Sequence, residues 1–297
     1  MEKIWQIEPA WLTKKRQLAV LLQSRFPSFP HQDIWTKQSS RQAQGSLDNN
    51  YLSVNEKYLT ALPLEEAVNE YSALLQENLM EKAVFWQDNQ LNANHLANID
   101  SGQFIYLHSQ GETEKPMVFS PHLKSTNSHN VIIISAGVNA VIEERMVNST
   151  LLPSYEATEI LVGANAHVTY RQANRSTSKN VYRTIHAYQA HGSTLNFEVA
   201  SQAHGAATVD LYSFLDGQKS RWNTTIALTG VQRLIALVDG FGQGTSATLT
   251  QYRDVKTIAG APFKVKAGEP LVISEDIYQL KELANKDSWL NRVITAK

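Results

Sequence analysis

From about residue 96 to residue 252 the sequence is a succession of short segments rich in Val, Ile, Thr and Tyr, separated by turns that contain Gly, Asn or Asp. β-Branched and aromatic residues favour strands, and Gly, Asn and Asp favour turns. Strands this short, this numerous and this evenly spaced indicate a barrel, a sandwich or a solenoid made only of β-structure. The expected strands are 104–107, 131–134, 140–142, 159–162, 167–170, 181–188, 194–199, 209–215, 222–228, 233–238 and 247–252.

A recurring turn favours the solenoid. A glycine is followed about three residues later by a small or apolar residue that enters a strand, as in residues 137–141, 163–168 and 205–209. A unit of one turn and one strand cannot bury its own inward face, so it gains stability by stacking on its neighbours. Because the repeat is irregular, the pattern alone leaves the sandwich and the solenoid nearly equal.

Helical segments flank this region. A first helix is expected from Pro9 to Pro27 and a second from Pro63 to about Trp86, joined by an extended polar connector over residues 28–50. The first helix is expected to place its apolar residues on one face, opposite its basic residues. The apolar face would hold Trp11, Leu12, Leu18, Leu21 and Leu22, and the basic face Lys14, Lys15 and Arg16.

A third helical segment is expected at the end of the sequence. Ser274 is a candidate N-cap, and Ile277, Leu280 and Ala284 follow at helical spacing. The sequence is therefore divided into an N-terminal helical region (1–95), a β core (96–270) and a short helical tail (271–297).

Composition and charge narrow the function. Lys and Arg (27) nearly equal Asp and Glu (28), so the basic excess of a nucleic-acid-binding protein is absent. The 297 residues include no cysteine, which excludes disulfides, thiolate ligands and a cysteine nucleophile. The longest apolar run, residues 131–134, is far shorter than the roughly 20 residues that span a bilayer, and residues 1–17 have no apolar signal region. We expect a cytoplasmic protein that binds neither nucleic acid nor membranes.

Two segments carry a resemblance to a known family. Residues 96–107, with Gly102 before an aromatic strand, are followed by Glu114-Lys115-Pro116. In residues 154–168 an acidic strand leads into the turn Gly163-Ala164-Asn165-Ala166. Both segments resemble the SufB/SufD family of iron–sulfur cluster assembly proteins, and the likeness extends over roughly residues 90–240.

The resemblance implies a right-handed parallel β-helix and a non-catalytic scaffold. In this family the B and D subunits pair through their β-helices and supply a surface for cluster assembly, while SufC is the ATPase. A chain without cysteine fits the D role, with a SufB-like subunit and a SufC-like ATPase, or a second copy of itself, as partners. No stably bound cofactor is expected, only a transient iron–sulfur cluster at the interface with the SufB-like subunit. The tail over residues 274–294 would substitute for the helices that dock on the ATPase.

No residue pattern predicts a catalytic or metal site. His122 and His129, like His186 and His191, lack a recognised ligand spacing. The glycine-rich segment 239–244 matches neither phosphate-loop pattern and is interpreted as a strand connection. The prediction is therefore no catalytic residue, no metal ligand and no assignable cofactor-binding residue.

Two other functions stay open. A carbohydrate-active or carbohydrate-binding β-helix would need carboxylates or basic side chains gathered on one exposed sheet face. Glu143 and Glu144 do not supply such a pair, because adjacent residues of a strand point to opposite faces. The other alternative is a purely structural oligomer.

Overall fold

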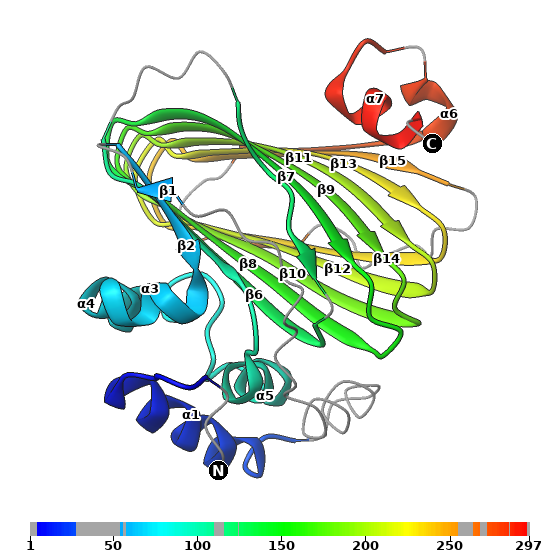
Figure 1. Cartoon of the computed structure of the whole chain (residues 1–297). Helices are drawn as coiled ribbons and strands as arrows, with labels where there is room; N and C mark the ends of the chain where they lie inside the picture. The colour runs from blue at the N-terminus through cyan, green and yellow to red at the C-terminus, as the bar shows by residue number, and fades with distance from the viewer. Residues whose placement is uncertain are drawn as a thin grey trace.

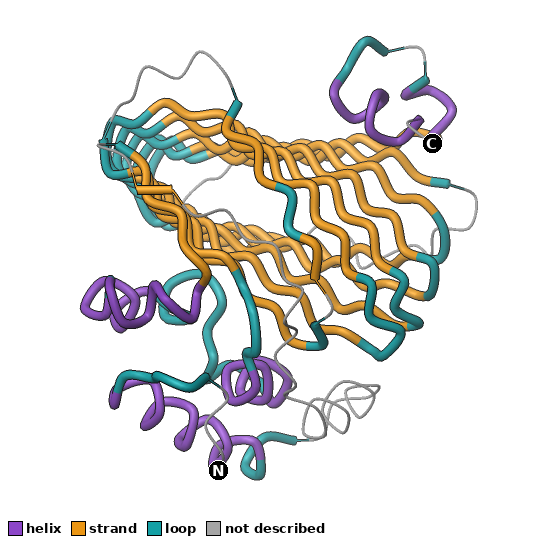
Figure 2. The backbone as a smooth tube through the Cα atoms, in the orientation of Figure 1, coloured by secondary structure: helices purple, strands orange, loops and turns teal. Residues whose placement is uncertain are grey.

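The computed structural model describes residues 5–27, 54–55, 58–109, 116–123, 125–254, 264–267, 272–284 and 286–295. It is a parallel β-helix of about six turns, with a helical region at its N-terminal end and short helices at its C-terminal end (Figures 1 and 2). This confirms the predicted fold class and excludes the sandwich, because neighbouring strands of the core pair in parallel.

Each turn contributes one strand to each of two sheets. The first sheet contains, in order, β3 (Gln103–Leu107), β6 (Asn127–Ile134), β8 (Ser154–Val162), β10 (Asn180–Gln189), β12 (Ala206–Leu215), β14 (Gln232–Gly240) and β16 (Lys264–Ala267). The second sheet contains β4 (Met117–Phe119), β7 (Asn139–Asn148), β9 (His167–Ser176), β11 (Thr194–Ala203), β13 (Arg221–Thr229), β15 (Ser246–Arg253) and β17 (Val272–Gln279). The short β5 (His122–Leu123) pairs with β7, and β1 (Val54–Asn55) and β2 (Leu59–Pro63) extend the first sheet beyond β3 in antiparallel fashion.

The register explains why the sequence repeat is irregular. Ser154, Val181, Ala207 and Gln232 are successive partners along the first sheet. The number of residues per turn therefore varies from one turn to the next, which blurs a fixed period without disturbing the stack.

Alternate side chains of each strand point into the solenoid and form its core. In β9 the inward residues Val168 and Tyr170 belong to one apolar cluster with Phe197 of β11 and Trp222 of β13. Further along the same strands the inward side chains are polar. One corner of the interior is therefore hydrophobic and the other carries a hydrogen-bonded network.

Glycine is required where one turn passes over the next. A Cβ added to Gly163 would lie 2.6 Å from the nitrogen of Ala136 and 2.8 Å from the carbonyl oxygen of Ile134, both in the preceding turn. Gly137 instead has room for a Cβ, but its φ of +73° is disfavoured for other residues. The glycines that mark turns in the sequence thus serve both close packing and turn geometry.

The first helix, α1 (Ala10–Gln23), lies at the predicted place, but its buried face was predicted only in part: Leu12 is buried, and Trp11 and Leu22 pack against the core. Leu18 and Leu21 are exposed, whereas Lys15 and Arg16 are buried. Burial is tolerated because Arg16 donates to Glu8 and to the carbonyl oxygens of Leu96 and Ile99. The polar connector predicted over residues 28–50 lies outside the described residues.

The second predicted helix is two short ones, α3 (Leu64–Glu70) and α4 (Ser72–Asn78), separated at Tyr71. A further helix, α5 (Gln90–Asn98), was missed; its N-cap Asn89 accepts from the backbone N–H of Asn92. The strand β2 before Pro63 was missed as well. These helices lie together below the first turns of the solenoid (Figure 1).

The prediction that Ser274 opens the C-terminal helix was also wrong. Residues of β17 continue the second sheet, and the helical part begins with α6 (Leu280–Leu283), followed by α7 (Trp289–Thr295). Both pack on the outer surface of the second sheet, where Ala200 and Ala227 lie flat beneath Trp289 and Leu290. The small side chains of these alanines let the helices approach the sheet.

Among the described residues no helix is long and apolar enough to span a bilayer.

Candidate functional site

A chain of buried polar groups joins the helical region to the solenoid. His95 of α5 contacts Asn127 Oδ1 through Nδ1 (3.0 Å) and His129 Nδ1 through Nε2 (2.9 Å). His129 Nε2 lies 3.0 Å from Glu159 Oε2. The two rings thus form a continuous chain of polar contacts from Asn127 to Glu159.

Glu159 is also the anchor of the loop before α5. Its carboxylate accepts from the backbone N–H groups of Met80 (2.7 Å) and Val84 (2.8 Å). His95, His129 and Glu159 are fully buried, and burial holds the pKa of His95 well below its usual value, so this ring is neutral. These groups cannot meet a substrate without unfolding, so their role is to dock the helices on the first sheet.

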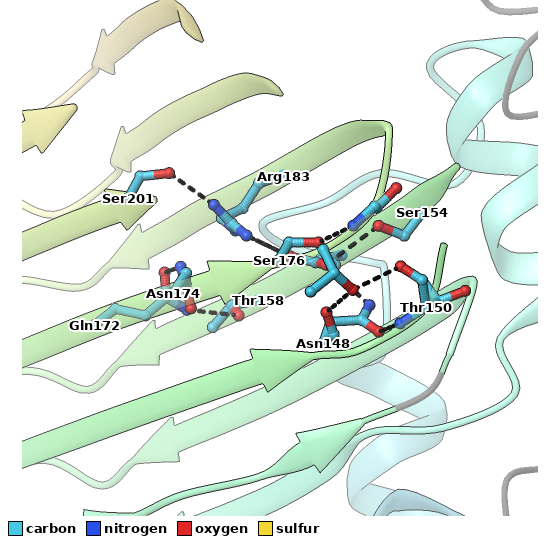
Figure 3. A network of polar contacts seen from close by, with 12 residues as sticks. Asn148, Thr150, Ser154, Thr158, Gln172, Asn174, Ser176, Arg183 and Ser201 are labelled. Carbon is cyan, nitrogen blue, oxygen red and sulfur yellow. Dashed lines mark hydrogen bonds and ion pairs between the residues drawn. The ribbon is translucent and has the colours of Figure 1, made fainter. Parts of the chain in front are cut away.

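A second network fills the polar corner inside the solenoid (Figure 3). Arg183 of β10 binds Glu156 of β8 through Nε (3.1 Å) and Nη2 (2.7 Å), and donates from Nη1 to Ser201 (2.7 Å). Asn148 donates to the other oxygen of Glu156, and Ser201 donates to Gln232. The network thus links consecutive turns through side chains as well as through the backbone ladder.

Glu144 forms a third buried cluster next to it. The carboxylate accepts from Asn130 (2.8 Å), from Gln172 (2.7 Å) and from the hydroxyl of Tyr170. Burial raises the pKa of Glu144, and the donors from Tyr170 and Gln172 oppose that rise. Glu143, in contrast, binds Arg145 on the outer surface. The prediction that these adjacent carboxylates face opposite ways is therefore confirmed, and they do not form an acid–base pair.

The outer surface of the first sheet carries aromatic and acidic side chains beyond the helices. Tyr182 donates to Asp210 (3.0 Å) and Tyr212 donates to Asp239 (3.2 Å) across neighbouring strands. Burial, together with the nearby Asp239, raises the pKa of Tyr212, so its hydroxyl keeps its proton. Each carboxylate has several acceptor positions, so each can accept a further donor from a ligand.

Three aromatic rings form a column on the same surface. Tyr188 stacks on Phe214 with ring centres 5.9 Å apart, and Phe214 lies 4.9 Å from Phe241. The planes of the Tyr188 and Phe214 rings are nearly parallel, at 17° to each other. Phe241, at the end of the column, is 47% exposed.

The last strand of the second sheet, β17, is exposed along its described length from Ile273 to Gln279. β17 pairs only with β15 among the described strands, so one edge of its backbone has no strand partner there. Ile273 and Ile277 lie opposite Ala247 and Gln251, whose side chains point inward, yet they are 38% and 56% exposed. The inward face of this last strand therefore exposes two isoleucines, with Glu275 between them accepting from Gln251.

Among the described residues, the histidines singled out in the sequence lie apart from one another. His129 is buried beside Glu159, His186 contacts the carbonyl of Ala83 and lies near Asp210, and His191 is exposed in a turn. The side chain of His122 lies outside the described residues. No group of three or more potential metal ligands occurs in the part of the chain that the structure describes.

The glycine-rich segment 239–244 connects β14 to β15, as predicted, and no helix follows it. What sequence reasoning missed is the chain from His95 to Glu159, because its members lie on separate elements and touch only after the solenoid has formed. The available signal was Glu159 on a buried strand face otherwise formed by Tyr155, Ala157 and Leu161.

Comparison with known proteins does not identify the chain. No protein-family model matches its sequence, and a search of curated proteins finds no match.

Proposed function

We propose that this protein is a non-catalytic scaffold that joins a partner through the C-terminal end of its β-helix. The supporting observation is the exposed last strand, β17, with Ile273 and Ile277 on its inward face. An edge strand offers unpaired backbone N–H and C=O groups that a strand of another chain can satisfy. Two apolar side chains beside that edge would add burial on association.

The resemblance to the SufB/SufD family suggests the partners, a SufB-like subunit at this end and a SufC-like ATPase. Any iron–sulfur cluster at such an interface would be cargo of the assembly, with cysteine ligands supplied by the partner because this chain has none. A second copy of this chain is the competing occupant of the same end.

The test is co-purification of the tagged chain, co-expressed with the SufB-like and SufC-like proteins of its own genome. We expect recovery of the SufB-like subunit, and at least a tenfold loss in an Ile273→Lys/Ile277→Lys variant, because charge would be buried at the interface. Leu151→Lys is the matched control, since Leu151 is 69% exposed in the connection between β7 and β8.

The outcomes distinguish whether the chain binds a partner at all from where on the chain the partner binds. Wild-type chain that recovers neither protein, measured as a monomer by light scattering, would overturn the scaffold proposal. Recovery that the double variant leaves unchanged would move the interface away from β17. A homodimer that the double variant abolishes would mean that the C-terminal end is an interface, but one between two copies of this chain and not with a SufB-like subunit.

A carbohydrate-binding function is the second candidate, and the carboxylates on the outer surface of the first sheet favour it. Asp210, Asp216 and Asp239 each pair with a tyrosine there. Carboxylate acceptors beside aromatic rings are suited to sugar hydroxyls. Retardation on neutral polysaccharide gels that Asp239→Asn abolishes would support this function, and unretarded wild-type protein would reject it.

A further inference from the structure

A groove lies between helix α7 and the outer surface of the second sheet. It has a volume of about 410 Å³, within the range of small-molecule sites. Its apolar walls are Val147 of β7, Ala173 of β9, and Trp289 and Val293 of α7.

The groove follows from the way α7 is seated. Ala173, Ala200 and Ala227 are successive partners across β9, β11 and β13. Trp289 packs with Ala200 and Ala227, whose small side chains let the helix approach the sheet. Toward β7 the alanine row ends at Arg145, the partner of Ala173, whose long side chain stands at the edge of the groove. The helix therefore covers one end of the row and leaves the other open.

The rim of the groove is cationic. Arg145, Arg175 and Arg292 line it, and no acidic side chain does so among the described residues. The side chains of Arg145 and Arg292 are 59% and 64% exposed. Arg145 binds one oxygen of Glu143, and Arg292 binds one oxygen of Asp287 through a single nitrogen. A guanidinium has five N–H donors, so both arginines keep donors for a further acceptor.

Trp289 gives the groove a fixed apolar wall. Its side chain is only 6% exposed and packs with Ala200, Ala227 and Leu290. The groove thus combines an apolar interior with a cationic rim.

We propose that this groove binds a small organic anion with an apolar body, such as a medium-chain or aromatic carboxylate. The apolar part would lie against Val147, Ala173 and Val293, and the carboxylate would accept from Arg145 and Arg292. Arginine favours carboxylates because its planar fork matches two oxygens. A cationic ligand would be repelled by the rim, and a polyanion such as RNA would not fill an apolar groove of this size. The site lies away from the exposed edge of β17 and does not depend on the scaffold proposal.

Octanoate and 1-octanol are matched probes, since both carry the same apolar chain and only octanoate is charged at pH 7. Calorimetric titration is expected to show saturable one-site binding of octanoate, at least tenfold tighter than that of octanol. The Arg145→Gln/Arg292→Gln variant should weaken octanoate at least tenfold and leave octanol unchanged. Salt at 0.5 M should weaken octanoate alone, because screening acts on the charged contact.

Arg171→Gln is the control, because Arg171 lies on the same strand and outer surface as Ala173 but pairs with Glu198 outside the groove. It should bind both probes as the wild type does. Both arginines replaced in the double variant are exposed, but Glu143, the partner of Arg145, is buried, so a modest fall in melting temperature is expected. An unchanged circular dichroism spectrum and a cooperative melt would show that the fold is intact. No saturable octanoate binding, equal affinity for both probes, or octanoate binding that survives in the double variant would overturn the proposal.

Discussion

Replacing Glu159 tests whether the buried polar chain holds the helical region on the solenoid. Glu159→Ala removes the acceptor of two backbone N–H groups, those of Met80 and Val84, and the partner of His129. All three donors would stay buried in the folded state. Removing one partner of a buried pair costs about 3–5 kcal/mol, and each stranded donor contributes about 1–3 kcal/mol. Since these costs overlap, we expect a loss of about 4 kcal/mol.

The assay is urea unfolding followed by circular dichroism, with hydrogen exchange of residues 79–98 measured alongside. The free energy of unfolding should fall. Hydrogen-exchange protection of residues 79–98 should be lost before that of the solenoid, because the helices would detach before the solenoid unfolds. Glu198→Ala is the control: its pair with Arg171 is partly exposed, so its loss should cost less than 1 kcal/mol. A Glu159→Ala protein as stable as the Glu198→Ala protein, with unchanged exchange, would refute the assigned role.

Three further predictions concern stability. Burial raises the pKa of Asp100 from its ordinary value of 3.8 to about 6, so this group favours folding fully below pH 3.8 and loses that contribution as pH rises through 6. Asp100→Asn should therefore gain up to about 3 kcal/mol in unfolding free energy over the wild type between pH 4 and pH 7, measured by urea unfolding. Gly163→Ala should destabilise the fold by more than about 2 kcal/mol, because the added Cβ would collide with backbone atoms of the preceding turn. Gly137→Ala should cost only about 1 kcal/mol of backbone strain, and thermal melts of the two variants would compare these costs. Arg183→Met should cost about 3–5 kcal/mol by leaving Glu156 unpaired, while Glu156→Leu/Arg183→Met should recover most of that loss in the same melts.

The solenoid core could be predicted from sequence because its signals are local. Each predicted strand from 104–107 to 247–252 lies within an observed strand, since β-propensity and turn residues act over a few positions. The choice between sandwich and solenoid required the pairing of strands a full turn apart, and no local pattern encodes that pairing.

The errors occur where tertiary contacts override periodicity. Lys15 and Arg16 are buried because their side chains donate hydrogen bonds to carbonyl oxygens and carboxylates of other segments. The spacing of residues along a helix cannot reveal such contacts. Residues 272–279 have a helix-like start in Ser274, Glu275 and Asp276, but pairing with β15 makes them a strand. The groove at Trp289 was missed for the same reason, because β7, β9 and α7 meet only in the folded chain.

The two ends of the solenoid differ in how other elements cover them, and this difference supports the proposed interface. At the N-terminal end, β1 and β2 extend the first sheet, and helices cover its outer surface through the buried chain that ends at Glu159. At the C-terminal end, α6 and α7 pack on the side of the second sheet and leave the exposed strand β17 at its edge. Helices that only protected the solenoid would be expected to cover the exposed strand edge and Ile277. Covering those groups would stabilise the solenoid more than covering the outer surface of the second sheet, which is already lined with alanine. Among the described residues, the open edge of β17 and the exposed Ile277 are therefore the features that support the proposed interface at this end.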